Sequence, residues 1–271
     1  MPILLNDILK IAAPSAYKLH LAGRSPGGEH PLDVFVRDRQ TWHSWNAWRG
    51  SKNDWTRPRI LSLIEYYPQP DAWLFGGVYE VIARRPDGYS LAQDPSFEKY
   101  VGRLVTRFHR YQGMRGRAFK LESYLDQFTV SELLPAVYSG EHFPGYGWVN
   151  HGFEALESIF GTGRPDWRAA LEHVKGVYLI VDHSNGKKYV GSAYGEAGLW
   201  ARWACYLGTG HGYNDELVAL IGAQGKGYAR QNFRFSVLEV MAVTTPDSVV
   251  LAREAHWKRT LLTRAFGYNR N

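Results

Sequence analysis

Two short blocks of sequence that flank a turn constrain the fold of this chain most strongly. A Gly-Val-Tyr block ends at Tyr178, and a Tyr-Val-Gly block begins at Tyr189. Between them, side chains alternate in the manner of a strand up to Asp182, and the pair that begins at Asn185 is Asn-Gly, a strong hairpin signal. The pattern predicts two neighbouring strands that bring Tyr178 and Tyr189 close together.

Three polar residues further along the chain accompany this hairpin. Arg202 lies in the segment GLWARWACY, Glu254 in AREAHWKRTLL and Asn269 in FGYNRN. The order and spacing of these residues after the tyrosine blocks resemble the GIY-YIG nuclease superfamily over residues 170–271. The resemblance implies an α+β fold, with a small antiparallel sheet flanked by helices, and hydrolysis of DNA phosphodiesters with one divalent metal ion.

The resemblance also implies roles for individual residues. The implied catalytic set is Tyr178, Tyr189, Lys188, Arg202, Tyr206, Glu254 and Asn269. In that set Arg202 would bind phosphate, Glu254 would bind the metal ion (Mg2+ or Mn2+), and Asn269 would form a polar wall of the active site. Alternatively, Arg202 is a solvated arginine on a helix, and Asn269 is an ordinary turn asparagine.

Two members of the set need separate comment. Tyr206 stands where some family members have a histidine, and the repair nucleases and certain restriction enzymes of the family resemble this chain in having tyrosine there. Tyr178 is suited to orient or deprotonate the attacking water if its phenol is helped. Lys188 is a candidate helper, because a nearby ammonium favours phenolate, and a solvent-facing hairpin lysine is the alternative.

Glu254 also stands out by its place in a helical pattern. Val250, Glu254, Trp257 and Leu261 recur at the spacing of one helical face, and three of them are apolar. A carboxylate on an apolar face is costly to bury unless a cation or hydrogen-bond donors compensate. Glu254 therefore either forms a structural ion pair with an arginine or acts as a metal ligand. The neighbouring tyrosine hairpin favours the metal ligand.

The composition limits the partners and the location of the chain. Its 271 residues suffice for one large domain or two modest ones, and its formal net charge of +6 favours a polyanionic partner. The single cysteine, Cys205, excludes a disulfide framework, and we expect it to be buried in a helix. No apolar run reaches the ~20 residues that cross a membrane, and the first residues lack the basic region of a signal peptide. We therefore expect a cytoplasmic protein without a membrane partner.

A glycine and proline cluster at residues 161–165 predicts a domain boundary. We expect residues 1–163 to form a β-rich or α+β DNA-binding and specificity domain, and residues 164–271 to form the nuclease domain. In the first domain we expect strands at 32–36, 59–64 and 77–82 and short helices at 6–16 and 132–138. In the second we expect helices at 166–171, 198–207 and 214–221, a strand at 233–241, and a long helix opened by Thr245 as its N-cap and Pro246.

Three groups of residues are candidates for contact with DNA. Residues 99–120 contain no acidic side chain and are rich in basic ones, including Arg103, Arg107, Arg110, Arg115 and Arg117. Beside a nuclease domain this segment favours phosphate contact, although a solvated basic face is the usual alternative. We expect residues 101–106 to be extended, because Gly102 and the β-branched residues there disfavour a helix.

The other two groups are a glycine-rich segment and a tryptophan cluster. Residues 208–232 carry His211, Lys226 and Arg230 and are typical of a mobile DNA-contacting loop or of an ordinary surface connection. Trp45 and Trp48, three residues apart, could line a helix stripe in the core or an aromatic pocket for an extruded base.

The most consistent function is a metal-dependent DNA endonuclease in restriction or defence, with recognition of modified bases as one variant. The alternatives are a repair or mobile-element nuclease and a catalytically inactive nucleic-acid-binding module. The expected partner is double-stranded DNA. Because one active site cuts one strand, we also expect a homodimer, which could form only on DNA, or sequential nicking by a monomer.

Overall fold

The computed structural model describes residues 2–24, 28–196 and 198–270 and shows a mixed α+β chain with two compact units, Met1–Tyr138 and Ser139–Asn271. The division falls earlier in the sequence than the expected boundary at residue 163. The reason is that β8 (Asn150–Gly152) pairs with β11 (Phe233–Ala242), so residues 139–163 belong to the second unit. None of the helices among the described residues is long and apolar enough to cross a membrane.

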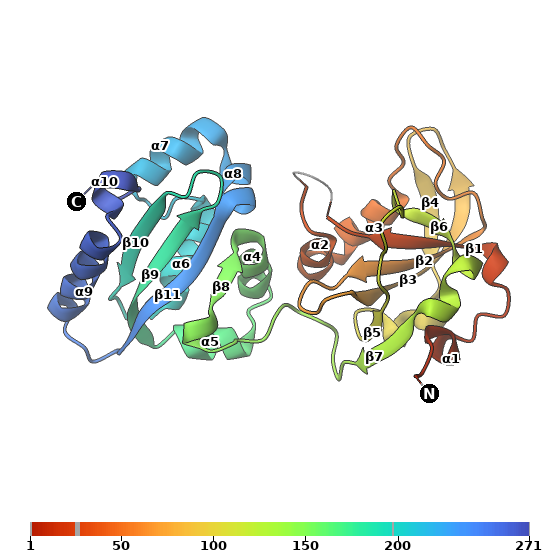
Figure 1. The fold of residues 1–271 in the computed structure, drawn as a ribbon, viewed down its shortest axis with the longest axis horizontal. Helices are drawn as coiled ribbons and strands as arrows, with labels where there is room; N and C mark the ends of the chain where they lie inside the picture. Colours follow the sequence, from red (N-terminus) through yellow and green to blue (C-terminus); the bar gives the residue numbers. More distant parts are fainter. Residues whose placement is uncertain (1, 25–27, 197, 271) are drawn as a thin grey trace. The chain divides into compact units, whose positions relative to one another are not determined.

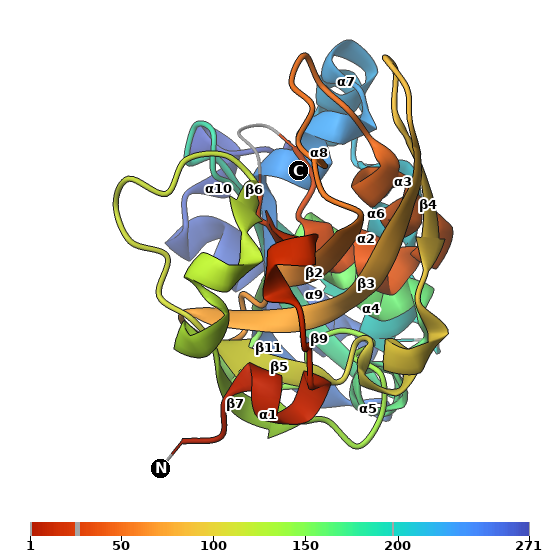
Figure 2. The same ribbon diagram turned by 90° about the vertical axis from the view of Figure 1, so that its right-hand side faces the viewer.

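Among the described residues of the first unit, seven strands form one sheet with the order β6-β1-β2-β3-β5-β7, and β4 pairs with β3 (Figure 1). The strands are β1 (Tyr17–Ala22), β2 (Arg59–Glu65), β3 (Ala72–Arg84), β4 (Tyr89–Gln93), β5 (Leu104–Arg107), β6 (Ala118–Lys120) and β7 (Thr129–Leu133). The pair β1 and β2 is parallel, and the other pairs are antiparallel. Figure 2 shows how β3 curves, so that its start pairs with β5 and its end with β4.

The helical segments of the first unit are short. They are α1 (Leu5–Leu9), η1 (Pro14–Ala16), α2 (Pro31–Arg37), α3 (Arg39–Ala47), η2 (Pro95–Tyr100), η3 (Leu121–Ser123) and η4 (Leu125–Gln127), where η marks a 3-10 helix. The expected helix at 6–16 is therefore interrupted. It ends at Lys10, which adopts a left-handed conformation with φ 53°, and Pro14 begins a separate turn.

Two further expectations for the first unit are wrong, whereas the strands at 59–64, 77–82 and 101–106 are confirmed at least in part. Residues 32–36 are helical, because Pro31 occupies the first turn and the His30 side chain accepts a hydrogen bond from the Leu32 amide. Residues 132–138 contain no helix; they begin as the end of β7, because Glu132 pairs with Val105 of β5.

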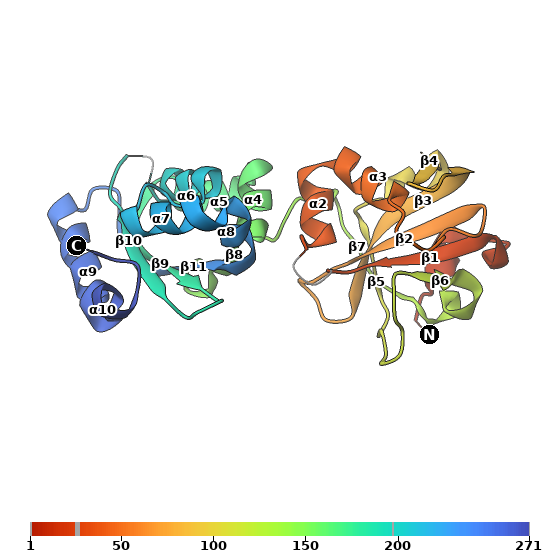
Figure 3. The ribbon, with the colours of Figure 1, turned by 90° about the horizontal axis from the view of Figure 1, so that it is seen from above.

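The second unit is built on a four-stranded antiparallel sheet of the order β10-β9-β11-β8. Its other elements are η5 (Tyr146–Trp148), α4 (Phe153–Gly161), α5 (Pro165–Leu171), β9 (Val174–Asp182), β10 (Lys188–Ala193), α6 (Gly198–Thr209), α7 (Asp215–Gln224), α8 (Lys226–Asn232), α9 (Asp247–Thr260) and α10 (Thr263–Phe266). Figure 3 shows α6 and α7 on one side of this sheet and α9 and α10 on the other.

Most expected elements of the second unit are confirmed. Asn214 caps α7 through its side chain, which accepts a hydrogen bond from the Leu217 amide at 3.1 Å. The long helix α9 begins at Asp247, and its N-cap is Pro246 rather than Thr245, because Pro246 has non-helical dihedral angles, φ −56° and ψ 137°. Residues 208–232 contain α7 and α8, so the expected loop is largely helical.

Candidate active site

The tyrosine hairpin has the expected arrangement. Strands β9 and β10 are antiparallel, with Tyr178 opposite Gly191 and Tyr189 opposite Ile180, and the two tyrosine rings lie with centroids 6.4 Å apart. A Cβ atom at Gly191 would overlap the Tyr178 hydroxyl and press on the Tyr189 ring. The glycine of the Tyr-Val-Gly block is thus required by the close approach of the Tyr178 hydroxyl to the backbone of β10.

Helix α6 adds an arginine to this pair of strands. The Arg202 Nε donates to the Tyr178 hydroxyl at 2.9 Å, and its Nη2 donates to the Tyr206 hydroxyl at 3.1 Å. The Tyr178 hydroxyl in turn donates to the Tyr206 hydroxyl at 3.1 Å, and both rings are fully buried. These bonds fix the guanidinium of Arg202 against the tyrosine rings.

Burial determines the charges in this group. It raises the pKa of Tyr178 well above the usual range, helped by the neighbouring Tyr189, and it raises the pKa of Tyr206 in the same direction. Burial alone would lower the pKa of Arg202, but the hydroxyls of Tyr178 and Tyr206 outweigh it and raise that pKa. At neutral pH the group is therefore a guanidinium cation bonded to two neutral phenols, and in this arrangement Tyr178 is suited to position Arg202.

Glu254 approaches β10 from α9, on the other side of the sheet. Its carboxylate accepts a hydrogen bond from the Ser192 hydroxyl and forms an ion pair with Lys258, with 2.7 Å between Nζ and Oε1. The Glu254 side chain is 13% exposed and that of Lys258 is 10% exposed. Val250, which shares the expected helical face with Glu254, is fully buried, so this face points inward there. The cation that pairs with the Glu254 carboxylate is a lysine rather than an arginine.

A cleft of about 640 Å³ lies at the edge strand β10 and is lined by residues of β10, α6 and α9. The polar and reactive side chains that line it are those of Tyr189, Ser192, Tyr194, Arg202, Cys205, Glu254 and Lys258. Two cations and one carboxylate therefore face the same space, which gives the cleft a positive balance suited to an anionic ligand. Cys205 lies in helix α6 as expected, but it is half-buried and lines this cleft, so its expected burial is wrong.

Four members of the expected set lie outside the lining of the cleft. Tyr206 is one of them, and its hydroxyl accepts a hydrogen bond from that of Tyr178. Tyr178 lies beneath Gly191. Asn269 clamps the backbone of Val190, because its Oδ1 accepts from the Val190 amide at 2.9 Å and its Nδ2 donates to the Val190 oxygen at 2.8 Å. The Lys188 ammonium donates to the Gly186 oxygen at 3.4 Å, which keeps it at the hairpin turn.

Ser192 and Lys258 line the cleft beside Glu254 but were not among the residues predicted from the sequence. Ser192 directly follows the Tyr-Val-Gly block, and Lys258 lies one helical turn after Glu254. The ion pair between Glu254 and Lys258 could have been predicted from their separation of four residues, because residues i and i+4 are neighbours on a helix. Nothing in the sequence alone indicates that Ser192 reaches Glu254, since that contact joins a strand to a helix more than fifty residues away.

The donor set can be tested against the implied metal ion. Within the described residues, no three His, Cys, Asp or Glu side chains lie close enough to hold a metal ion together. Glu254 lines the cleft as a single carboxylate. Mg2+ commonly takes one or two carboxylates and completes its shell with water and ligand phosphates, so a single glutamate in an open cleft is compatible with a magnesium site of this kind.

Most of the candidate DNA-binding arginines of the first unit are engaged within it. Arg103 donates to the Leu134 oxygen at 2.9 Å, and Arg110 donates to the oxygens of Met114 and Gly116. The bonds of the exposed Arg107 to Ser131 and Gln69 are long, at 3.4 and 3.5 Å. Arg115 is exposed at the tip of the segment between β5 and β6. Arg107 and Arg115 are therefore the better placed of these side chains to meet phosphate.

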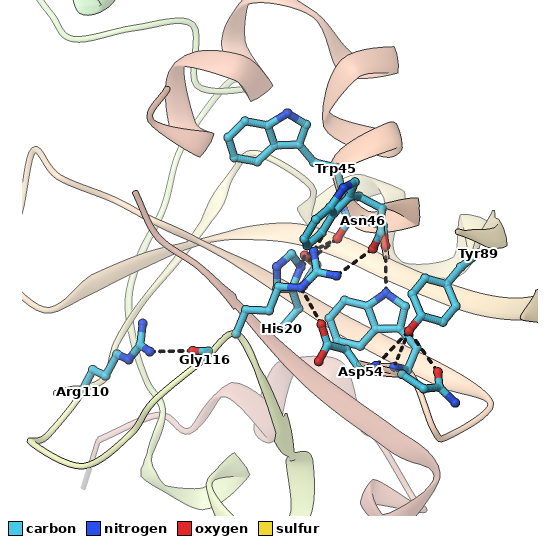
Figure 4. A network of polar contacts seen from close by, with 12 residues as sticks. His20, Trp45, Asn46, Asp54, Tyr89, Arg110 and Gly116 are labelled. Atoms are coloured by element: carbon cyan, nitrogen blue, oxygen red, sulfur yellow. Dashed lines mark hydrogen bonds and ion pairs between the residues drawn. The ribbon is translucent and has the colours of Figure 1, made fainter. Parts of the chain in front are cut away.

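Arg117 belongs to a polar network around the tryptophan cluster (Figure 4). Its guanidinium bonds to the Asp54 carboxylate at 2.9 Å and to the backbone oxygens of Trp45 and Trp48. Trp45 is half-buried, and its indole points away from the network. Trp48 is 59% exposed and lies just after α3, with the Arg117 guanidinium 4.8 Å from its ring centroid. The two tryptophans do not line a common stripe, and Trp48 is the one available to a ligand.

The candidates between α6 and β11 are also engaged. Lys226 and Arg230 both pair with Glu157 of α4, at 3.0 and 2.9 Å. The His211 Nδ1 accepts a hydrogen bond from the Tyr213 amide at 3.0 Å. These contacts fasten α8 to α4 and shape the turn before α7.

Comparisons with known proteins find a match to one solved structure and no match to a protein family. No family model matches the chain, and no curated protein matches it. A mutant form of the catalytic domain of intron endonuclease I-TevI is 26% identical, covering 36% of this chain and 94% of its own, with a TM-score of 0.29. A TM-score of this size does not establish a common fold.

Proposed function

We propose that the second unit is a metal-dependent DNA endonuclease of the GIY-YIG type and that the protein acts in restriction or defence. The observation that supports this proposal best is the cleft at β10. There the Arg202 guanidinium and the Glu254 carboxylate reach the same space from helices on opposite sides of the sheet. Phosphodiester hydrolysis needs both kinds of group, a cation for the phosphate oxygens and a hard oxygen ligand for a metal ion.

Each side chain has a role that follows from its position. A divalent cation held by Glu254 would polarise the phosphoryl oxygen and stabilise the leaving oxygen. Arg202 neutralises charge that grows on the phosphate in the transition state, an effect of about 2.7–4 kcal/mol for one well-placed donor. Tyr178 and Tyr206 hold the Arg202 guanidinium in place. Tyr189, which lines the cleft, offers a hydroxyl that can orient the attacking water.

Recognition of the target is assigned to the first unit. The cleft residues address phosphate and metal, which carry no base sequence, so specificity must come from other contacts. Arg107 and Arg115 are exposed cations, and Trp48 offers a flat exposed ring of the kind that stacks on a base, modified or not. An active site of this kind cuts one strand at a time, so cleavage of a duplex requires two chains or successive nicks.

The test is cleavage of a panel of unmodified and modified phage DNAs by the wild type, Glu254→Gln and Glu132→Gln. The last variant removes an equal charge from an exposed residue of β7 in the first unit. We expect Glu254→Gln to lose about three orders of magnitude in rate. It should keep DNA binding in a gel-shift assay with chelator, while Glu132→Gln behaves as the wild type. Cleavage in excess chelator, or a folded and fully active Glu254→Gln, contradicts the proposal.

A further inference from the structure

Lys258 occupies a position in the cleft that the proposed chemistry does not yet explain. It is a buried cation on α9, 8% exposed as a residue, and its ammonium lies 2.7 Å from the carboxylate that would hold a metal ion. The other Glu254 oxygen accepts from Ser192, so both carboxylate oxygens already have partners. A divalent cation that binds Glu254 must therefore take the place of Lys258 or lie directly beside it.

The electrostatics make these two cations competitors. Two like charges a few ångströms apart repel each other strongly near a protein surface, and a dication doubles that repulsion. The low exposure of the pair limits the screening that water and salt provide. The Lys258 ammonium would have to move away from Glu254 for a metal ion to bind well.

The shape of the site allows that movement. Lys258 itself lines the cleft of about 640 Å³, and a lysine ammonium sits on a flexible four-carbon stem. Arg202 lines the same space from α6, so an ammonium turned away from Glu254 stays in the cleft with a second cation. An anion such as a DNA phosphate is the partner that these two positive charges would share.

We propose that Lys258 is an exchangeable counter-cation of Glu254. It holds the carboxylate in position, is displaced from it when a divalent metal ion binds, and then contacts the phosphate of the DNA. This inference rests on the proposed nuclease function and assigns to the same site a device that weakens metal binding until a phosphate is present to receive the ammonium.

The experiment measures metal binding to the full chain without DNA, by electron paramagnetic resonance of free Mn2+. The variants are Lys258→Met, which keeps the apolar stem, and Lys258→Gln, in case the first does not fold. Arg259→Met is the control, because Arg259 is an exposed cation next along α9 that does not line the cleft. We expect the Mn2+ dissociation constant to fall about tenfold in both Lys258 variants, equivalent to about 1.4 kcal/mol, and to stay unchanged in Arg259→Met.

Cleavage at saturating Mn2+ provides the second readout. We expect the Lys258 variants to cleave about tenfold more slowly although they bind the metal more tightly, because the phosphate loses one cation. Structural damage would instead weaken metal binding and slow cleavage together, which overturns the proposal. It is also overturned if cleavage depends on Glu254 while Mn2+ affinity in the Lys258 variants is unchanged. If Glu254→Gln binds Mn2+ as tightly as the wild type and the wild type cuts no DNA, both this inference and the nuclease function are wrong.

Discussion

In each unit of the protein an arginine lies among aromatic rings, Arg202 in the second unit and Arg117 in the first, and the two are held by different partners. In the second unit, Arg202 donates to the hydroxyls of Tyr178 and Tyr206, which burial keeps neutral. Its positive charge is therefore not cancelled by these partners, and its guanidinium lines an open cleft. Phenol hydroxyls can orient a guanidinium while leaving its charge to act on a ligand.

In the first unit, Arg117 lies near two indoles, 4.8 Å from the ring centroid of Trp48 and 5.0 Å from that of Trp55. Its Nε bonds to the Asp54 carboxylate, and the side chain is only 22% exposed. The ion pair cancels the charge locally, and further bonds to backbone oxygens fix the segment that follows α3. The comparison indicates that the partner of the guanidinium, rather than the aromatic surroundings, decides whether the charge of an arginine is neutralised within the protein or left open to a cleft.

The largest effect that sharpens this comparison is expected at Arg202. Arg202→Ala should reduce kcat/KM for DNA cleavage by about 10²–10³, because the developing phosphate charge loses its donor. Arg202→Lys should recover only part of that loss, since an ammonium lacks the planar fork that two phenols hold here. Steady-state cleavage assays with circular dichroism as a folding control measure both. An Arg202→Ala variant that is folded and cleaves at the wild-type rate would break the comparison.

Arg117 should give the opposite pattern, a loss of stability without a loss of chemistry. Arg117→Met leaves the partly buried Asp54 carboxylate without its cation, and we expect the first unit to lose about 2–3 kcal/mol. Hydrogen–deuterium exchange of peptides from β1 to β3 reports this loss separately from the second unit. Cleavage of a short duplex per folded molecule should change less than twofold. A large drop in cleavage with unchanged exchange would instead place Arg117 on the DNA.

The residues that were predicted best from sequence are those fixed by local patterns. The hairpin follows from the Asn-Gly turn and strand alternation, and it accounts for the closeness of Tyr178 and Tyr189, whose ring centroids lie 6.4 Å apart. The spacing of Val250 and Glu254 likewise places the carboxylate on the inward face of α9. Local periodicity carries such information because it depends only on neighbours in the chain.

The features that the sequence did not predict depend on contacts between distant segments. The unit boundary was misplaced because β8 is a three-residue strand whose partner, β11, lies far along the chain. Residues 32–36 alternate like a strand but form part of α2, in which Leu32 to Phe35 are buried at successive positions, so tertiary packing overrides the short-range pattern. The predicted set of cleft residues was incomplete for the same reason. The contact of Ser192 with Glu254 joins a strand and a helix that no local sequence pattern relates.

A smaller effect, dependent on pH, tests whether the network beside Arg117 is structural. His20 is 3% exposed, and its Nδ1 lies 2.9 Å from both the Asn46 Oδ1 and the Ser62 Oγ. Burial, with a contribution from the positive charge of Arg117, lowers the pKa of His20 from 6.5 to about 3. The folded protein therefore keeps His20 neutral at pH values where the unfolded chain would protonate it.

The sign of the pH effect follows from this difference. Above pH 6.5 both states leave His20 neutral and the full stability is present; as the pH falls from 6.5 towards 3, only the unfolded state takes up the proton, so stability is lost. The expected slope is about 1.4 kcal/mol per pH unit, or about 2 kcal/mol between pH 6.5 and pH 5. Hydrogen–deuterium exchange of β1 and β2 peptides over this range, corrected for the intrinsic exchange rate, measures it. In His20→Gln the slope should disappear whatever the absolute stability of the variant, because glutamine does not titrate. If the slope is unchanged in that variant, groups other than His20 cause the acid sensitivity of the first unit, and the proposed contribution of His20 is wrong.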